Sequence, residues 1–443
     1  MDRRTYLTAL GATITGAATT GIAAAKDHPV YRPGGPWPGQ LQAINLNGLL
    51  TNEQLADRLQ QIDRRSDRLD LRQIGQSAGR NAPIWEATVG TGDTNVHLIT
   101  QIHGDEPVGT EVAVDLLREL ALSDSRQVRS ILDELTLTVV PRVNPDGAMF
   151  HYDIDDDGRS EWVGRRTNTQ RWNADDSRYE PWYHYTHPDG TTPGYDMNRD
   201  FNLRPPSEFD PRTDTDPGWW SQVDGDWYLD MPYEGYTLLA SGLRLAPEVR
   251  AVTRSYLDAD PDIAITHHHQ GAYLVPDSGN GNGPADQTVM SVMGQYGPAY
   301  IEQSPFYDPD VPVEQVVNPF VDAATSTRSL RLNALVANAL AERGNSVFDT
   351  ITRYSYLPLW GSYLDALTPH TDAAGMLYEV SYQTDDRGQM SLGRMVEATR
   401  VGFVESLEAL ATETLDQVSA SDYFDIPTHG KSLDNPHLSM RRR

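Results

Sequence analysis

Residues 95–120 read NVHLITQIHGDEPVGTEVAVDLLREL. Residues 95–102 form an apolar run typical of a β-strand, and this run ends at His103. Pro107 then stands where proline is favoured at the first position of a helix, and we expect that helix to continue to Leu120. This stretch therefore predicts a strand that leads through a short turn into a helix.

Strand and helix patterns alternate along the rest of the chain. Apolar segments predict strands at 70–89, 135–140, 263–266 and 376–380. Apolar residues at helical spacing predict helices at 52–68, 325–343 and 392–415. Strands that alternate with helices are typical of an α/β domain.

Composition divides the chain into segments. Residues 1–25 carry Arg3 and Arg4 before a run of Ala, Gly, Thr and Ile, which predicts a cleaved twin-arginine export signal and an extracellular or cell-surface location. That run is too rich in Gly and Thr for stable membrane insertion. We expect the other segments to be a lead at 26–50, a main domain at 51–418 with a loop-rich insertion at 150–245, and a tail at 419–443.

Charge and cysteine content exclude several classes of protein. The 443 residues include 63 acidic and 36 basic ones, the formal net charge is −27, and lysine occurs only at Lys26 and Lys431. Such an acidic, lysine-poor chain is typical of a halophile, and its field repels nucleic acids. The absence of cysteine excludes disulfides, thiolate zinc sites and cysteine nucleophiles.

Two histidine motifs indicate a metal site. His103 and Glu106 stand three residues apart at the predicted turn, where an imidazole and a carboxylate can reach one cation. A surface histidine beside an acidic helix start is the alternative explanation. Residues 266–271 (THHHQG) follow a short apolar strand, and alternation places His268 on one face and His267 on the other. One face therefore offers a single histidine to a cation.

Two further motifs contain candidate functional charges. Arg199 lies between Asn198 and Asp200, and a surface ion pair is the structural alternative to a binding role. Glu379 lies in a predicted buried strand. Because burial of an ionisable group is costly, Glu379 is either an ion-paired structural residue or a base with a tuned pKa.

The order of the motifs resembles that of the zinc carboxypeptidase family. The motifs are HGDE at 103–106, NPDG at 144–147, NRDF at 198–201, the histidines at 267–269 and YE at 378–379. The resemblance implies a single α/β domain with a mixed, mostly parallel twisted sheet flanked by helices, with the active site at the C-terminal ends of the strands. It also implies a zinc-dependent metallocarboxypeptidase that hydrolyses the C-terminal bond of peptides and proteins.

The resemblance assigns the metal ligands and the base. His103, Glu106 and His268 are the expected zinc ligands, with His267 as the alternative to His268. Two histidines and one carboxylate leave the fourth zinc position open, which is typical of catalytic sites. Zinc is expected to acidify a water molecule there, and Glu379 to take the proton as general base.

The resemblance also assigns the residues that bind substrate. Asn198 and Arg199 are expected to bind the free α-carboxylate of the peptide, because an arginine fork matches a carboxylate. Arg165 is expected to polarise the scissile carbonyl. Its neighbour Arg166 is the alternative for that role and a second candidate for binding substrate.

A late tyrosine and the residues after it are expected to close the site. The resemblance assigns Tyr356 as the substrate-capping tyrosine, with Tyr354 as the alternative. Tyr363 or Leu364 is expected to line the pocket for the terminal side chain, which favours apolar or aromatic C-terminal residues.

Residues 153–161 (DIDDDGRSE) indicate a second metal site. Their carboxylates follow the first part of a calcium-binding EF-hand loop, at Asp153, Asp155, Asp157 and Glu161. Gly164 stands where such loops carry a bidentate glutamate, so we expect weak calcium binding. A solvated acidic loop is the alternative.

Two other functions fit the same motifs. A zinc-dependent deacylase of N-acyl amino acids, of the aspartoacylase or desuccinylase type, shares the fold and the metal site. The NPDG motif, Tyr356 and the export signal favour the peptidase over it. A non-catalytic cell-surface binding protein on the same scaffold is the second alternative, and the complete ligand set with Glu379 disfavours it.

Overall fold

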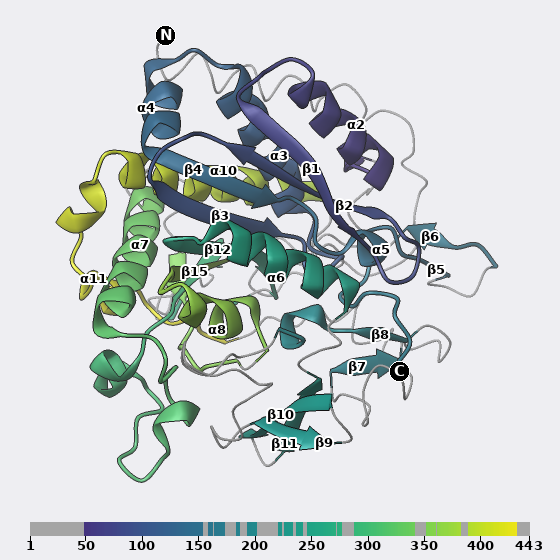
Figure 1. The fold of residues 1–443 in the computed structure, drawn as a ribbon. Coiled ribbons are helices and arrows are strands. Elements are labelled where there is room, and N and C mark those ends of the chain that lie inside the picture. Colours follow the sequence, from purple (N-terminus) through teal and green to yellow (C-terminus); the bar gives the residue numbers. More distant parts are fainter. Residues whose placement is uncertain are drawn as a thin grey trace, which may run out of the picture.

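The computed structural model (Figure 1) shows a central sheet with helices on both faces. It describes residues 48–431 except for the gaps at 154–157, 163, 173–182, 187–192, 202–219, 224–225, 234–235, 242–245, 272, 277–287, 342–350, 360 and 382–388. Within this part of the chain, no helix combines the length and apolar character needed to cross a membrane.

Eight strands form the central sheet. In chain order they are β1 (Leu69–Gln76), β2 (Pro83–Val89), β3 (Thr94–Thr100), β4 (Leu135–Val140), β12 (Ile263–Gln270), β13 (Met290–Gly294), β14 (Ile351–Arg353) and β15 (Ala374–Ser381). Their order across the sheet is β1-β2-β4-β3-β12-β15-β13-β14. The four middle strands are parallel, whereas β1, β2 and β13 each form antiparallel pairs. The predicted single α/β domain with a mixed, mostly parallel sheet is confirmed.

Helices cover the two faces of this sheet. They are α2 (Asn52–Asp63), α3 (Val108–Leu122), α4 (Arg126–Glu134), α5 (Pro145–Ala148), α6 (Pro247–Ala259), α7 (Ala323–Ala341), α8 (Tyr363–Leu367), α10 (Gln389–Ala411) and α11 (Asp422–Asp425). Helices α3, α4, α7 and α10 contact one another and the strands on one face, and α6 and α8 contact strands on the other (Figure 1). Short 3-10 turns occupy η3 (Pro298–Gln303), η4 (Val313–Gln315), η5 (Thr368–His370) and η6 (Thr414–Gln417).

Two apolar cores follow from this layering. On β3, Val96 and Leu98 point into the larger core beneath α3 and α10, whereas Ile99 points into the smaller core beneath α6 and α8. Alternate side chains of a strand point to opposite faces, so one apolar strand serves both cores. The sheet is therefore packed against helices on both faces, up to the edge where the parallel strands end.

Some elements differ from their predicted extent. The region at 70–89 forms the two strands β1 and β2, joined by a turn in which Asn81 has a positive φ of 53°. Strand β12 continues through the histidines to Gln270 instead of ending at Thr266. Pairing with β15 along its whole length explains this extension, because it satisfies the backbone of the polar residues.

The predicted loop-rich insertion contains short strands. They are β5 (His151–Tyr152), β6 (Glu161–Trp162), β7 (His184–Thr186), β8 (Pro193–Tyr195), β9 (Trp220–Val223), β10 (Asp226–Tyr233) and β11 (Tyr236–Ser241), and the 3-10 turn η2 covers Met197–Arg199. Strands β9, β10 and β11 form a three-stranded antiparallel sheet. The sequence did not predict these strands because the apolar residues of this region show no clear period.

The start of the predicted tail packs into the domain. Tyr423 of α11 is fully buried in the larger core, and its hydroxyl accepts a hydrogen bond from the Gly294 N–H at 3.1 Å. The domain therefore extends beyond the predicted boundary at 418, and the described chain follows it to Lys431. Residues 432–443 lie outside the described part of the chain, as do residues 1–47 with the predicted export signal.

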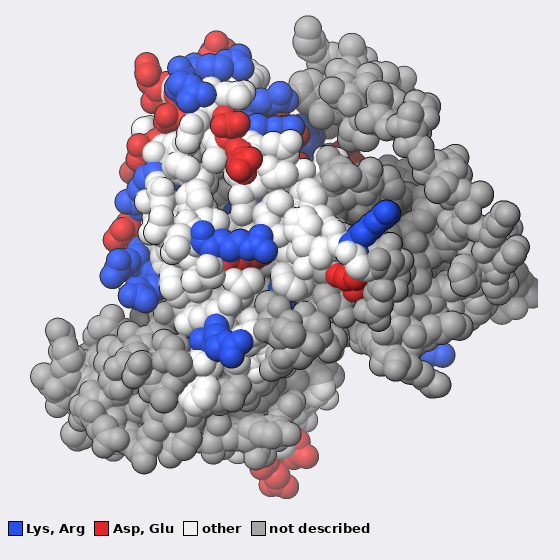
Figure 2. Space-filling model, turned by 90° about the vertical axis from the view of Figure 1, so that its right-hand side faces the viewer, with Lys and Arg blue, Asp and Glu red and all other residues white. Residues whose placement is uncertain are grey.

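The described surface carries both signs of charge. Figure 2 shows arginine and acidic side chains close together on one face, with uncharged surface between them. Arg331 and Asp416 form such a pair at 2.8 Å. Exposed pairs of this kind contribute little to stability. The halophilic origin and the exclusion of nucleic acids stay predictions from composition.

Candidate metal centre

Three buried side chains converge at the end of the parallel strands. His103 Nδ1 lies 2.9 Å from Glu106 Oε1, and His268 Nδ1 lies 3.1 Å from Glu106 Oε2. The two histidine Nδ1 atoms are 3.1 Å apart. Within the described chain, this is the one group of three such residues with ligand atoms close enough to share a metal ion.

The chain reverses between β3 and α3 to present two of these ligands. Strand β3 ends at Thr100, Gln101 adopts a positive φ of 51°, and α3 begins at Val108. The backbone at Gly104 lies against Gly147, where an added Cβ would come within 2.1 Å of the Gly147 carbonyl carbon. Only glycine fits at that point, so the tight HGDE turn depends on it.

The donor set fits a zinc ion. Zinc bonds to histidine nitrogen at about 2.0–2.1 Å in tetrahedral sites, which places neighbouring ligand atoms about 3.3 Å apart. The observed separations of 2.9 to 3.1 Å are close to that edge. The opposite ring nitrogens are also engaged, His103 Nε2 with Asp196 at 3.3 Å and His268 Nε2 with the Thr266 hydroxyl at 3.0 Å. Such outer contacts orient metal-binding histidines.

The other two histidines of β12 point away from this cluster. His267 Nε2 lies 2.8 Å from the Thr399 hydroxyl of α10, and the His267 ring packs against Phe403. His269 Nε2 accepts the Val108 N–H at 3.3 Å. Strand alternation thus separates His268 from His267, as the sequence pattern predicts.

Asp196 joins the metal cluster to an arginine. Its carboxylate bonds His103 through Oδ1 and accepts the Arg166 Nε–H through Oδ2 at 2.8 Å. Burial raises the pKa of Asp196, but the charges of Arg166 and Arg199 hold it well below its ordinary value. Asp196 is therefore an ionised carboxylate that orients both the His103 ring and the guanidinium of Arg166.

Arg166 and Arg165 lie in different environments. The Arg166 Nη1 is 3.3 Å from His103 Nδ1 and 4.0 Å from Glu106 Oε1, and the side chain is partly exposed. Arg165 is 6% exposed, its Nε donates to the Thr167 hydroxyl at 2.8 Å, and its guanidinium lies over the Phe150 ring. The structure thus places Arg166, rather than the predicted Arg165, beside the metal ligands.

The NPDG motif holds this arginine segment in place. The Asn144 side chain donates to the Arg166 carbonyl at 3.1 Å, and the Arg165 N–H donates to the Gly147 carbonyl at 2.8 Å. The buried Asp146 carboxylate accepts hydrogen bonds from Ser77, Gly79, Arg80 and Thr169. These contacts fix which of the two adjacent arginines faces the metal cluster.

Glu379 stands next to His268 across the sheet. The two residues are register partners on β15 and β12. Burial and the nearby Glu106 raise the pKa of Glu379 to about 7, against a hydrogen bond from Tyr354 and the charge of Arg166, which lower it. A carboxyl group with this pKa beside a metal cluster can exchange a proton near neutral pH.

As with the two arginines, one candidate tyrosine lies at the site and the other is buried in the core. Tyr354 is partly buried, and its side chain is close enough to Glu379 for each group to shift the pKa of the other. Tyr356 is 1% exposed, and its hydroxyl donates to Asp365 Oδ1 at 2.5 Å. The predicted capping residue Tyr356 is thus held in the core, and the alternative Tyr354 lies at the site.

The NRD motif is fixed by the turn that precedes α8. Asn198 Oδ1 accepts the Tyr363 N–H at 3.0 Å, and the Phe201 N–H donates to the Gly361 carbonyl at 3.0 Å. Gly361 has a φ of +84°, and an added Cβ would come within 2.2 Å of the Arg199 carbonyl oxygen. Arg199 itself is partly exposed, and its Nη1 donates to the Asn198 carbonyl at 2.7 Å.

The residues expected to line a side-chain pocket are buried. The Tyr363 hydroxyl lies 2.6 Å from His97 Nδ1, and Tyr363 and Leu364 belong to the smaller core. Their exposed fractions are 0% and 2%. A preference for apolar C-terminal residues stays a prediction.

The predicted calcium loop lies mostly outside the described residues. Residues 154–157, with Asp155 and Asp157, fall in a gap, and so does the Glu161 side chain. Asp153 is described, and its Oδ2 accepts the Gly158 N–H at 2.8 Å. That contact is typical of a tight acidic turn with or without a metal.

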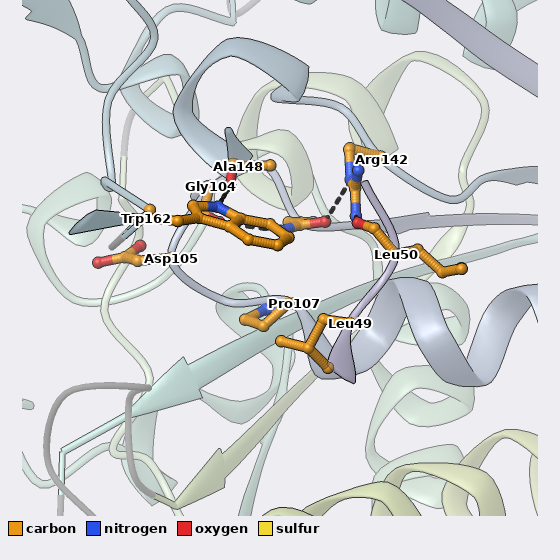
Figure 3. A pocket seen from close by; sticks show the side chains of 10 residues that line it. Leu49, Leu50, Gly104, Asp105, Pro107, Arg142, Ala148 and Trp162 are labelled. Carbon is orange, nitrogen blue, oxygen red and sulfur yellow. Dashed lines mark hydrogen bonds between the residues drawn. The ribbon is translucent and has the colours of Figure 1, made fainter. Parts of the chain in front are cut away.

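A small pocket lies behind the metal-binding turn (Figure 3). Trp162, Leu49 and Pro107 line it, and the Trp162 indole N–H donates to the Ala148 carbonyl at 2.6 Å. Arg142 borders it and donates through Nη2 to the Leu50 carbonyl at 2.8 Å. The end of the predicted lead segment therefore supports the back of the turn.

Three contacts at the site escaped the sequence analysis. The contact of the Asp196 carboxylate with His103 was not predicted, and neither were the bond from Asn144 to the Arg166 carbonyl and the position of Tyr354 beside Glu379. Asp196 alone leaves a signal, because an aspartate that caps a short turn two residues before Asn198 is a recognisable pattern. The NPDG motif marks Asn144 and the late tyrosines include Tyr354, but no local pattern shows which groups these side chains contact.

Comparison with known proteins agrees with this geometry. The sequence model of the zinc carboxypeptidase family matches residues 55–329. No curated protein sequence matches the chain. Among solved structures, thrombin activatable fibrinolysis inhibitor is 13% identical with a TM-score of 0.50, covering 84% of this chain and 78% of its own.

Two carboxypeptidases of other organisms are also similar. A metallo-carboxypeptidase from Burkholderia cenocepacia is 14% identical with a TM-score of 0.45, covering 83% of this chain and 70% of its own. Carboxypeptidase A from Helicoverpa armigera is 14% identical with a TM-score of 0.46, covering 82% and 74%. Since the family model spans more than half of the sequence and the ligand cluster is complete, the chain belongs to the zinc carboxypeptidase family.

Proposed function

We propose that this protein is a zinc-dependent metallocarboxypeptidase that removes the C-terminal residue of peptides and proteins. The convergence of His103, Glu106 and His268 beside Glu379 is the observation that carries the proposal. Zinc bound by these three ligands would supply Lewis-acid activation of a water molecule and of the scissile carbonyl. An exported location, a halophilic origin and weak calcium binding at 153–161 are further proposals that rest on the sequence.

The chain's own side chains perform the remaining steps. Glu379 takes a proton from the attacking water and delivers it to the leaving amine. Arg166 donates to the carbonyl oxygen as negative charge develops on it, held there by Asp196. Arg199, with Asn198, binds the terminal carboxylate, which restricts cleavage to the last peptide bond. Tyr354 covers the site next to Glu379.

Replacement of Arg166 by alanine tests the choice between the adjacent arginines. We expect Arg166→Ala to lower kcat about 100-fold, the usual effect of losing one donor to a developing oxyanion. Arg165→Ala should lower the melting temperature but keep kcat within a few fold, because its guanidinium packs on Phe150. Steady-state kinetics and thermal unfolding of both variants check this, and the reverse pattern would restore Arg165 to the catalytic role.

Replacement of Arg199 by alanine tests recognition of the terminal carboxylate. We expect Arg199→Ala to raise KM for peptides with a free C-terminus by about tenfold or more, since a charge-assisted pair contributes about 1.5–3 kcal/mol. Slow hydrolysis of the matching C-terminal amides should be unaffected, because they offer no carboxylate. Arg171→Ala, at an exposed arginine, is the control. Equal losses on both substrates would assign Arg199 a structural role, and a preference for N-acyl amino acids would favour the deacylase.

A further inference from the structure

The chain after α11 pairs with β14 and with the segment that follows β12. The Arg353 N–H donates to the Pro427 carbonyl at 2.9 Å, and the His429 N–H donates to the Arg353 carbonyl at 3.2 Å. Beyond them, the Gly430 N–H donates to the Leu274 carbonyl at 2.7 Å. Residues 426–431, here named the C-terminal strap, are therefore bonded to β14 and to the segment that follows β12.

The close approach of the strap to that segment is sterically demanding. An added Cβ at Gly430 would come within 2.8 Å of the Leu274 carbonyl oxygen. The Leu274 N–H in turn donates to the Lys431 carbonyl at 3.0 Å. This two-way pairing fixes the position of His429 relative to the chain beside it.

His429 packs between two tyrosines. Its ring centroid lies 4.3 Å from that of Tyr273 and 4.7 Å from that of Tyr354. The centroids of the two tyrosine rings are 6.3 Å apart. Aromatic rings at such distances attract one another beyond the area that they bury.

Tyr354 connects this aromatic cluster to the reaction. It begins an irregular stretch after β14, and its backbone N–H donates to the Val292 carbonyl at 3.0 Å. Ser291, the neighbour of Val292 on β13, is the register partner of Glu379, and the Tyr354 and Glu379 side chains are close enough for each to shift the pKa of the other. Because no regular element continues through Tyr354, the position of its ring depends on side-chain packing.

We propose that His429 is a positioning residue that holds Tyr354 against Glu379, so that the C-terminal strap forms part of the active site. The proposal rests on the proposed carboxypeptidase function. The strap lies beyond residues 55–329, which the family model matches, and it belongs to the segment that the sequence predicted to be a tail.

Kinetics of the zinc-loaded protein test this role. We expect His429→Ala to lower kcat/KM about tenfold, the effect of losing two aromatic contacts. His429→Phe should restore most of the activity, because it keeps a ring between the tyrosines. Asp425→Ala, at an exposed side chain of α11, should match the wild type. In a Tyr354→Ala background, His429→Ala should cause no further loss, since its effect passes through that tyrosine.

A second measurement does not depend on activity. Nitration of Tyr354 by tetranitromethane, followed by peptide mapping, should be several-fold faster in His429→Ala than in the wild type or in Asp425→Ala. If the wild type lacks peptidase activity, the proposed function fails, and the nitration rates alone decide whether His429 holds Tyr354. Unchanged nitration, or losses that add in the double variant, would overturn the proposal.

Discussion

Glu379→Gln should retain zinc and the fold but lose about 100-fold or more of its turnover, the range that general acid–base catalysis contributes. The amide has nearly the same shape as the carboxyl group but cannot accept the proton of the attacking water. Glu134→Gln, at the exposed end of α4, is the matched control and should be fully active. Zinc content, melting temperature and kcat of the three proteins check this, and near-normal turnover of Glu379→Gln would refute the assigned base.

The pH dependence of kcat/KM tests the role of Glu379 as general base in a second way. The carboxylate is the acting form, and burial raises the pKa of Glu379 to about 7, so kcat/KM should rise as pH increases through this pKa. A positive metal ion favours the carboxylate, which moves this acid limb to a pH below 7. The limb should be absent from the residual activity of Glu379→Gln.

His268→Ala should abolish both zinc binding and turnover, whereas His267→Ala should retain both. His268 offers its Nδ1 to the ligand cluster, while His267 bonds Thr399 on the other face of β12. Loss of a direct ligand should reduce zinc affinity more than the 10–100-fold that is typical of outer contacts. The wild type should bind about one zinc per chain, as its three ligands predict.

Metal analysis and thermal unfolding with added zinc measure this difference. Zinc should raise the melting temperature of the wild type and of His267→Ala but not that of His268→Ala, because only a folded state that binds the ion gains stability from it. Zinc retained by His268→Ala but lost from His267→Ala would reverse the assignment of the two neighbours.

The sequence predicted well those features that periodicity controls. The strand before His103 and the helix after Pro107 place two ligands on one turn, and strand alternation separates His268 from His267. Each of these predictions uses a local rule that the buried sheet enforces, since a shift by one residue would move every side chain to the wrong face.

The sequence and the structure favour different residues where the chain has no regular secondary structure. Arg165 and Arg166 follow a glycine with a positive φ, and the contacts of Asn144 and Gly147 decide their orientations. Tyr354 and Tyr356 lie in an irregular stretch, where Asp365 draws one of them into the core. Contacts between residues far apart in sequence decide both choices, so a local pattern contains no signal for them.

Product analysis of one peptide in two forms tests the carboxypeptidase assignment most directly. The zinc-loaded protein is incubated with a peptide that has a free C-terminus and with its C-terminal amide, and mass spectrometry follows the products. The account predicts stepwise loss of single C-terminal residues from the free form at a far higher rate than from the amide, stopped by a zinc chelator and restored by zinc. Cleavage at internal bonds, equal rates on the two forms, or cleavage that continues in the chelator would contradict it.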